Sequence, residues 1–402
     1  MKTTSKLKLI EFLDGLYFAT VITSLFAVSK GITLSQIVVA QGLFSLAVII
    51  MEVPTGLVAD KFGKKFSMAL GYAINAFGII LFALIPTLFN FYIMRFLQAT
   101  GSALVSGANE ALLYEASKDE GLNFKKQISI LNSNSIIGLC LAGAIAGVVY
   151  QIFGSASFIP ILLATALVQV IAFLLSMSIK ERALKAYQSI VKKELKIFHL
   201  LSSGYISIRK NKTIFALTMF GMLAACNEYF LYQTYAPYFK SIGVANFWVA
   251  SSFSIGLLLN FVITRNIWKI EKYITLEKAL AFSKILAILG YLGLALVTQS
   301  SLLVIILIST IGIFNIERPI ISDFANQEID SHNRATVLSG MSLASRITKA
   351  LITFVVAAII ARSSVTTGYL VTAIYLTMGT MVAYWLLVKC GCVRRVNHVY
   401  EN

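Results

Sequence analysis

The sequence predicts an all-α membrane protein with twelve transmembrane helices arranged as two six-helix bundles. Of its 402 residues, 58% are hydrophobic and 13% are charged, whereas a soluble protein carries about 25% charged residues. Apolar runs close to the roughly 20 residues needed to cross a hydrocarbon core recur from end to end of the chain. One longer polar segment divides these runs into two sets of six.

Each apolar run is assigned to one span. The first six spans lie at 8–29, 36–58, 66–86, 90–114, 128–150 and 157–179. The second six lie at 213–237, 246–265, 278–298, 301–322, 335–361 and 366–389. We therefore expect an N-terminal bundle over 1–179, a cytoplasmic linker over 180–212, and a C-terminal bundle with a short cytoplasmic tail over 213–402. An amphipathic stripe in the linker predicts a helix that lies along the membrane surface.

The basic residues set the expected orientation. Of the 34 Lys and Arg residues, 26 fall in segments on one side of the predicted spans and three, Lys30, Lys240 and Arg362, fall on the other. Cytoplasmic loops carry the excess of basic residues, so both termini are expected in the cytoplasm, in a bacterial inner membrane. These residues are scattered over many loops rather than gathered in a groove with stacking aromatics, which argues against nucleic-acid binding.

The loop between spans 2 and 3 carries an unusual charged stretch, GLVADKFGKK, from Gly56 to Lys65. Glycine at position 63 permits a backbone conformation that other residues avoid, and glycine at position 56 lets another helix approach closely. The stretch resembles the signature of the major facilitator superfamily at this loop. The resemblance implies that Asp60 lies against the start of span 11 and holds the two halves together. The latch residues are Gly56, Asp60, Gly63, Lys64 and Lys65.

Two further stretches resemble patterns of the same family. In span 4, YIMRFLQATGSALVSG is similar to an R-x-x-Q-G-x-G pattern through Arg95 and Gln98, and the family associates this arginine with proton coupling. In span 5, IGLCLAGAIAGVV keeps Gly138, Gly143 and Gly147 of a glycine pattern found in efflux members but has no proline. The missing proline weakens the case for an antiporter, and such glycines also let helices pack closely.

Ten charged side chains are candidates for function because they lie inside predicted spans. A charge at a helix centre costs about 2.5–3.5 kcal/mol on insertion scales, whereas one leucine or isoleucine returns only about 0.3–0.6 kcal/mol. Such residues usually face the bundle interior. They are Glu11, Asp14, Glu52, Arg95, Glu110, Glu228, Glu317, Arg318, Arg346 and Lys349. Lys284 is set apart, because it lies near the inner end of its span and is expected to extend to the membrane surface.

Helical spacing sorts these charges into polar faces. Arg95, Gln98, Ser106, Asn109 and Glu110 fall within about one third of the circumference of span 4 at 3.6 residues per turn. In span 7, Glu228, Tyr232 and Tyr235 share a face near Asn227. The proton-coupling candidates are Glu110, Glu228, Arg95 and Asp14. The substrate-binding candidates are Gln98, Ser106, Asn109, Asn227, Tyr232, Tyr235 and Arg346. Charged residues of this kind also fix helix packing, and the tyrosines also serve packing.

These features predict a secondary active transporter that exports a small organic molecule, such as a drug, a siderophore or a peptide antibiotic, by alternating access. The proton gradient is the expected energy source, with no cofactor and no metal, and the expected partners are the substrate, protons and lipid, for a monomer that binds no nucleic acid. A proton-coupled nutrient importer is the alternative, and a receptor or scaffold on a transporter fold is a third reading. An enzyme is not expected, since the three histidines lie in polar or terminal segments and no phosphate-binding loop is present.

Overall fold

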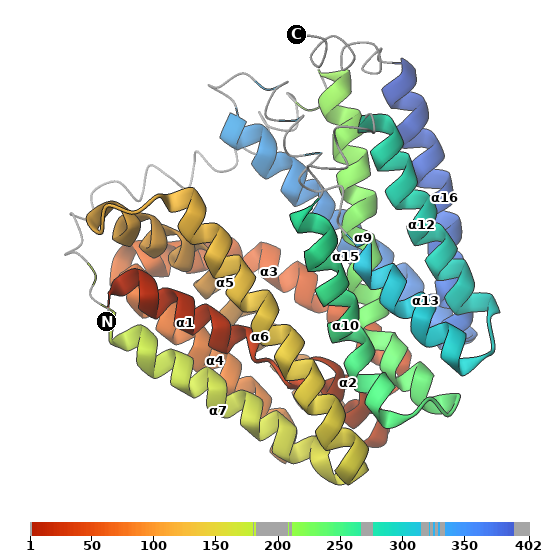
Figure 1. The fold of residues 1–402 in the computed structure, drawn as a ribbon, viewed down its shortest axis with the longest axis horizontal. Helices are drawn as coiled ribbons and strands as arrows, with labels where there is room; N and C mark the ends of the chain where they lie inside the picture. Colours follow the sequence, from red (N-terminus) through yellow and green to blue (C-terminus); the bar gives the residue numbers. More distant parts are fainter. Residues whose placement is uncertain are drawn as a thin grey trace. The chain divides into compact units, whose positions relative to one another are not determined.

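The computed structural model describes residues 2–179, 181, 208, 211–266, 276–314, 321, 325, 329 and 334–389. These residues form helices and no strands (Figure 1). The helices are α1 (Thr3–Gly15), α2 (Ala19–Ser29), α3 (Leu34–Phe62), α4 (Lys64–Leu84), α5 (Leu88–Asp119), α6 (Phe124–Phe153), η1 (Gly154–Ser157), α7 (Phe158–Met177), α9 (Lys212–Ser241), α10 (Asn246–Arg265), α12 (Leu276–Leu296), α13 (Ser300–Gly312), α15 (Arg334–Arg362) and α16 (Val365–Lys389). Each of the twelve predicted spans corresponds to one or two of them, so the predicted fold class is confirmed.

Length and composition allow most of these helices to cross a membrane. Within the described ranges, eight helical segments are long and apolar enough, and one of them, Phe124–Met177, holds both α6 and α7. Two shorter apolar helices, Leu280–Leu296 and Ser300–Gly312, fall below that length. The α5 helix is as long as a span, but it carries polar side chains along its whole length, which lower its hydropathy.

The chain separates into two compact units. Unit 1 comprises residues 1–190 and 233–258, and unit 2 comprises residues 191–232 and 259–402. In unit 1, α4 packs against α5 and α7, α3 packs against α5, and α1 packs against α6 and α7. In unit 2, α12 packs against α16 and α13, and α15 packs against α16. Most of the predicted linker over 180–212, with its expected surface helix, lies outside the described residues.

Short polar side chains begin three of the helices in unit 1. Thr33 forms a capping box before α3. Its hydroxyl accepts a hydrogen bond from the backbone N–H of Gln36 at 3.3 Å, and the Gln36 side-chain oxygen accepts one from the backbone N–H of Thr33 at 2.9 Å. Thr87 caps α5 in a similar way, and Asn123 caps α6. Each cap satisfies a backbone N–H that the first turn leaves without a partner.

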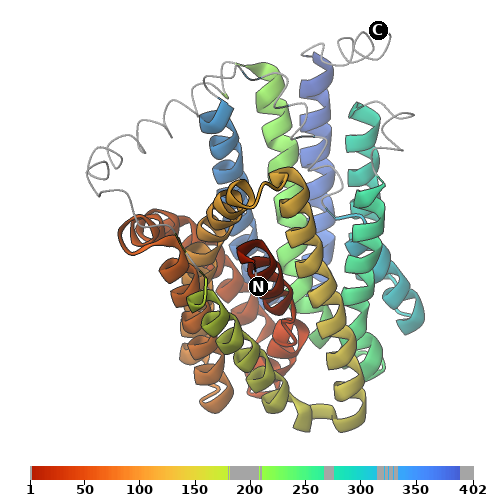
Figure 2. The same cartoon turned by 60° about the vertical axis from the view of Figure 1, so that its left-hand side comes forward.

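The core of unit 1 lies where α1, α4, α5 and α7 meet (Figure 2). Leu7 and Ile10 of α1 are fully buried there, against Met68 and Tyr72 of α4 and Leu113 of α5. The first helix of the chain is therefore an internal element of its unit. This places the polar residues farther along α1 inside the unit as well.

Large apolar side chains cover the outside of several helices. On α6 they recur every three or four residues, at Leu141, Ile145, Val148 and Ile152, and each is close to half exposed or more. A soluble monomer rarely exposes such continuous apolar surface, whereas lipid tails are a suitable environment for it. The exposed stripes thus mark the lipid-facing sides of the helices.

Candidate functional site

The first predicted span is broken in its middle. The sequence predicts one helix over 8–29, but α1 ends at Gly15 and α2 begins at Ala19, so the prediction of one continuous helix is wrong. The Thr165 hydroxyl of α7 accepts the free backbone N–H of Ala19 at 3.0 Å. A side chain from a neighbouring helix thus replaces a hydrogen bond that the break removes, which is how irregular backbone is tolerated at membrane depth.

Close packing against α6 fixes the position of this break. A Cβ atom built on Gly15 would overlap the carbonyl oxygen of Ser135, and one built on Gly138 would overlap that of Phe12. The two glycines therefore let the backbones of α1 and α6 approach more closely than larger residues allow. Glycine at position 138 serves helix packing in this structure.

A chain of polar side chains runs from the break into α5 and α3. The Arg95 guanidinium donates to the Gln98 side chain at 2.8 Å and to the Gln41 side chain. Gln98 in turn donates to the hydroxyl of Tyr17, which lies in the break. Arg95 also lies 4.7 Å from the ring centroid of Phe44. The arginine is half-buried, and hydrogen bonds and a cation–π contact hold its charge in place.

The two acids of α1 each meet a buried amide. The Asn109 side chain of α5 donates to a Glu11 carboxylate oxygen at 2.6 Å. The Gln169 side chain of α7 donates to an Asp14 carboxylate oxygen at 2.9 Å. Two predicted site residues thus take part in these contacts: Asp14 is itself on α1, and Asn109 of α5 binds Glu11 of α1. Glu11 was considered only as a charged residue of the span, and Gln41, Gln169 and Tyr17 were missed.

The predicted polar stripe on α5 divides into two parts. Gln98 and Asn109 are buried and bind other helices of unit 1. Ser106 and Glu110 are exposed at the surface of the helix. The stripe is therefore not one continuous lining: its buried half holds the helices together, and its exposed half is open to solvent, lipid or a ligand.

The candidates on α9 are described in part. The side chains of Asn227 and Glu228 lie outside the described residues. The Tyr232 ring lies 6.1 Å from the ring of Phe314, and the fully buried Tyr235 stacks on Phe253 at 6.5 Å between ring centroids. Tyr235 thus packs in a core, whereas Tyr232 is only partly buried.

In unit 2, the structure describes the predicted site residue Arg346 and contradicts the prediction made for Lys284. Arg346 is half-buried on α15. Lys284 was expected to extend to the membrane surface, but its side chain is only 1% exposed, so that prediction is wrong. The position of a lysine near the end of a span therefore does not by itself predict exposure at this site. Glu317 and Arg318 lie outside the described residues.

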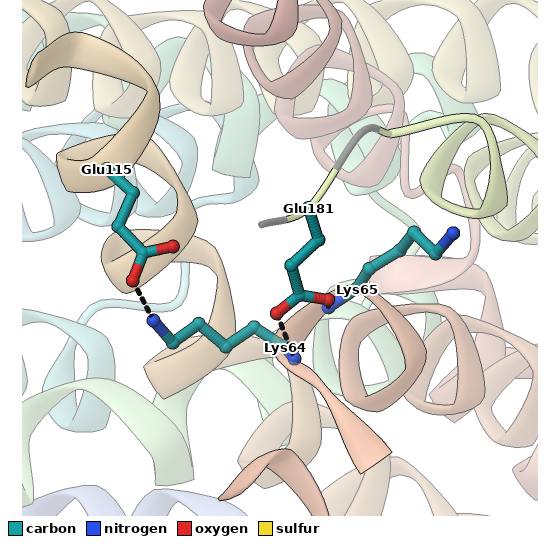
Figure 3. Close-up of polar contacts among 4 residues, drawn as sticks. All are labelled: Lys64, Lys65, Glu115 and Glu181. Atoms are coloured by element: carbon teal, nitrogen blue, oxygen red, sulfur yellow. Dashed lines mark hydrogen bonds and ion pairs between the residues drawn. The ribbon is translucent and has the colours of Figure 1, made fainter. Parts of the chain in front are cut away.

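The predicted latch loop is reduced to a single residue, Gly63, because Gly56 and Asp60 lie in α3 and Lys64 and Lys65 begin α4. Two glutamates contact the start of α4 (Figure 3). Gly63 separates α3 from α4 with a φ of 100°, which confirms the predicted need for glycine. The Glu181 carboxylate accepts the backbone N–H groups of Lys64 at 2.8 Å and Lys65 at 3.1 Å. Since these groups begin α4, the carboxylate stands at the positive end of that helix. Glu181 was not predicted.

The side chains of the remaining latch residues are arranged differently from one another. The Lys64 ammonium forms an ion pair with Glu115 of α5. Asp60 is exposed and is not without a partner. A Cβ atom built on Gly56 would meet nothing within 4 Å among the described residues, so the close helix approach expected there is not seen in the described part of the chain.

The remaining glycines of the span-5 pattern face α10 within unit 1. A Cβ atom built on Gly143 would overlap the Ser254 hydroxyl, and one built on Gly147 would overlap the Ser251 hydroxyl. The Gln151 side chain at the end of α6 accepts the backbone N–H of Phe247 at 3.0 Å. These contacts explain the glycines by packing, whether or not the pattern also marks an exporter.

Comparison with known protein families matches the model of the Major Facilitator Superfamily to residues 8–353. The chain belongs to the Major Facilitator Superfamily. It is accordingly a multi-pass membrane transporter. The match extends over both predicted bundles and includes the GLVADKFGKK loop and the Arg95 helix, the two places where the sequence most resembles the family.

Relatives of this superfamily member are distant. Over 140 residues it is 26% identical to an uncharacterized MFS-type transporter of Methanocaldococcus jannaschii, which covers 35% of this chain and 36% of the relative. Over 159 residues it is 28% identical to an uncharacterized transporter of Buchnera aphidicola subsp. Schizaphis graminum, which covers 39% of this chain and 40% of the relative. The chain therefore spans about two fifths of the length of the curated relatives it matches.

The fold of this superfamily member is also found in solved structures. A variant of the nucleoside transporter NupG superposes with a TM-score of 0.80 at 16% identity, and the match covers 96% of this chain and 100% of that one. At such identity the likeness concerns the fold alone.

Proposed function

We propose that this transporter is a proton-coupled exporter of a small organic molecule, a drug, a siderophore or a peptide antibiotic, that works by alternating access in a bacterial inner membrane with both termini in the cytoplasm. The proton gradient supplies the energy, and no cofactor is needed. The observation that supports this proposal best is the chain of polar contacts from Gln41 through Arg95 and Gln98 to Tyr17. A charge held at membrane depth is expensive and is usually kept for a function.

In this proposal, the polar residues divide the work. Arg95, Asp14, Glu110 and Glu228 couple transport to protons. Arg95 reaches the helix break of α1 through Gln98, so a shift in its position changes the electrostatic surroundings of the acids. Of the predicted substrate residues, Ser106, Tyr232 and Arg346 are at least partly exposed and are proposed to contact substrate together with Asn227. Gln98, Asn109 and Tyr235 are buried, so we propose that they support this site through packing. Aromatic rings beside acids suit a cationic or amphipathic substrate.

The latch residues hold one of the two alternating states. Glu181 and Glu115 tie the start of α4 to the segment after α7 and to α5, next to the last turn of α3, which carries Asp60. In this proposal, a single contact of Asp60 discriminates between the two states. Replacement of Asp60 by Asn is expected to slow transport while substrate binding remains.

A nutrient importer is the second candidate. One observation favours it: the glycine pattern of α6 lacks its proline. The NupG structure that shares the fold is that of a nucleoside transporter, which makes a nucleoside a suitable probe. Direction of transport separates the two candidates. The receptor or scaffold reading has no specific observation in its favour.

Inverted membrane vesicles provide the test. The vesicles are energised until their lumen is acidic, and a pH-sensitive dye follows the gradient while ethidium, as a cationic probe, or uridine, as a nucleoside probe, is added. An exporter that exchanges ethidium for protons discharges the gradient, and vesicles with Arg95→Ala do not. Uridine uptake into intact cells that stops with a protonophore favours the importer. Transport that continues at full rate with the protonophore contradicts proton coupling in either direction.

A further inference from the structure

Glu11 and Asp14 form a pair of acids on one face of α1. They are three residues apart, so they are neighbours on the helix surface. The hydrogen bond of Glu11 to Asn109 measures 2.6 Å, and that of Asp14 to Gln169 measures 2.9 Å. Two acids, from one helix, are thus each joined to an amide from a different neighbouring helix, α5 and α7.

Both amides are buried and only half satisfied. The Asn109 side chain is 6% exposed and that of Gln169 is 1% exposed. In each, the amide nitrogen donates to the acid, while the amide oxygen has no hydrogen-bond partner among the described residues. An acceptor buried without a donor is costly, so the arrangement is incomplete when both acids are ionised.

A proton on the acid completes it. An ionised carboxylate only accepts hydrogen bonds, whereas a protonated carboxyl group also offers an O–H donor. A protonated carboxyl group can therefore pair with one amide through two hydrogen bonds at once: its O–H donates to the amide oxygen, and its C=O accepts the amide N–H. Asn and Gln are suited to this task because they carry a donor and an acceptor on one planar group.

The surroundings contain few other groups that titrate. Tyr72 of α4 lies in electrostatic range of both acids, and its buried hydroxyl has no partner among the described residues. Glu110 of α5 acts on Glu11, and Arg95 of α5 acts on Tyr17 of α1. Ser135 of α6 offers an uncharged hydrogen bond to Glu11. The pair therefore sits in a mostly uncharged setting in which a proton is the simplest ligand.

We propose that Glu11 and Asp14 are the proton-binding pair of this transporter, and that Asn109 and Gln169 are positioning residues whose amides serve both the charged and the neutral acids. This inference rests on the proposed proton coupling and names its site on α1 rather than on Glu110 or Glu228. The helix break directly after Asp14 connects the pair to Tyr17 and hence to Gln98 and Arg95.

Infrared difference spectroscopy tests the pair without any transport substrate. The full chain in lipid vesicles is stepped through a series of pH values, and the C=O band of protonated carboxyl groups is followed. We expect Glu11→Gln and Asp14→Asn each to remove part of this band, and the exposed control Asp119→Asn on α5 to leave the band from the membrane interior unchanged. Where a neutral variant disrupts the fold, Glu11→Asp and Asp14→Glu keep a carboxyl group and should shift the band.

The amides have a distinct signature. Gln169→Leu and Asn109→Leu remove the N–H that stabilises the ionised acid, and a hydrogen bond to a charged group is stronger than one to a neutral group. The titration of the band is therefore expected to move to higher pH, by about tenfold in proton affinity, which corresponds to about 1.4 kcal/mol. A purely structural role would lower stability without moving the titration.

Three results overturn this inference. The first is that the interior band persists when both acids are neutralised. The second is that the amide variants titrate like the wild type. The third is that the titration shifts when Na⁺ replaces choline, which would make the pair a sodium site. Failure of the proposed function looks different: the band titrates as expected, but vesicles show no transport that depends on a pH gradient.

Discussion

Polar side chains on α1 and on the exposed face of α5 have opposite surroundings. On α1, Glu11 and Asp14 are each bound by a buried amide from a neighbouring helix. On α5, Ser106 and Glu110 are exposed on the helix surface. The first arrangement fixes a charge in a defined position, and the second leaves groups free to meet a ligand or water. The first arrangement suits the proton binding that we propose for α1, and the second leaves Ser106 and Glu110 accessible to a substrate or to protons.

The largest effect is expected from Arg95→Ala. Removal of the guanidinium leaves the acceptor oxygen of Gln98 unsatisfied, at about 1–3 kcal/mol for a buried group. It leaves the Gln41 oxygen with only the longer hydrogen bond from Gln233 at 3.4 Å. We expect transport to fall more than tenfold and the melting temperature to fall. Arg95→Lys keeps the charge but cannot reach both amides in the fixed geometry of a guanidinium, so its thermal stability should lie in between. Wild-type melting and transport in Arg95→Ala would contradict a role for the polar chain.

The next effect concerns how tightly α1 is held. Gly138→Val places atoms where the carbonyl of Phe12 lies, and overpacking of this kind costs about 1–3 kcal/mol. The matched control is Gly107→Ala on the exposed face of α5, where a Cβ atom meets nothing within 4 Å. In a helix this exchange is neutral or stabilising by up to about 1 kcal/mol. Thermal unfolding of the two variants measures the difference, and equal destabilisation would remove the contrast between the two faces.

A smaller effect is expected at the turn that holds Gly63. Glu181→Gln keeps only one of the two oxygens that accept the backbone N–H groups of Lys64 and Lys65, and it removes the charge at the start of α4. The charge contributes about 0.3–1 kcal/mol of unfolding free energy, and this part of the loss should shrink as salt is added. Urea unfolding at low and high salt measures it. A loss that does not depend on salt would show that Glu181 acts through packing instead.

The smallest effect on stability is expected on the exposed face itself. Ser106→Ala and Glu110→Gln remove groups that are exposed, so the unfolding free energy should change by less than about 0.5 kcal/mol. If these residues contact substrate, the substrate concentration for half-maximal transport rises while the maximal rate changes little. Strong destabilisation of either variant would place them in a buried network and end the comparison.

The sequence allowed the spans and some of the site to be predicted, for identifiable reasons. Apolar length locates a helix, and a charged loop with a glycine locates the turn at Gly63. Contacts between helices are a different matter. Nothing in the span around Gln169 shows that it faces Asp14, because the partner depends on which helices are adjacent. The break after Gly15 could not be predicted from the sequence, because no proline lies there. Lys284 was misplaced because its burial depends on the elements that pack around α12, which the sequence of that span does not show.

One measurement tests the central claim most directly. In reconstituted vesicles that contain Asp14→Asn, substrate accumulation driven by a pH gradient is compared with exchange of substrate for substrate at equal pH on both sides. The substrate is one identified in the dye assay. A residue that carries the coupled proton is needed for net movement against a gradient but not for exchange of substrate for substrate. We predict that accumulation is lost, by at least about tenfold, while exchange continues near the wild-type rate. Accumulation at the wild-type level in Asp14→Asn would contradict the claim that α1 holds the coupled proton.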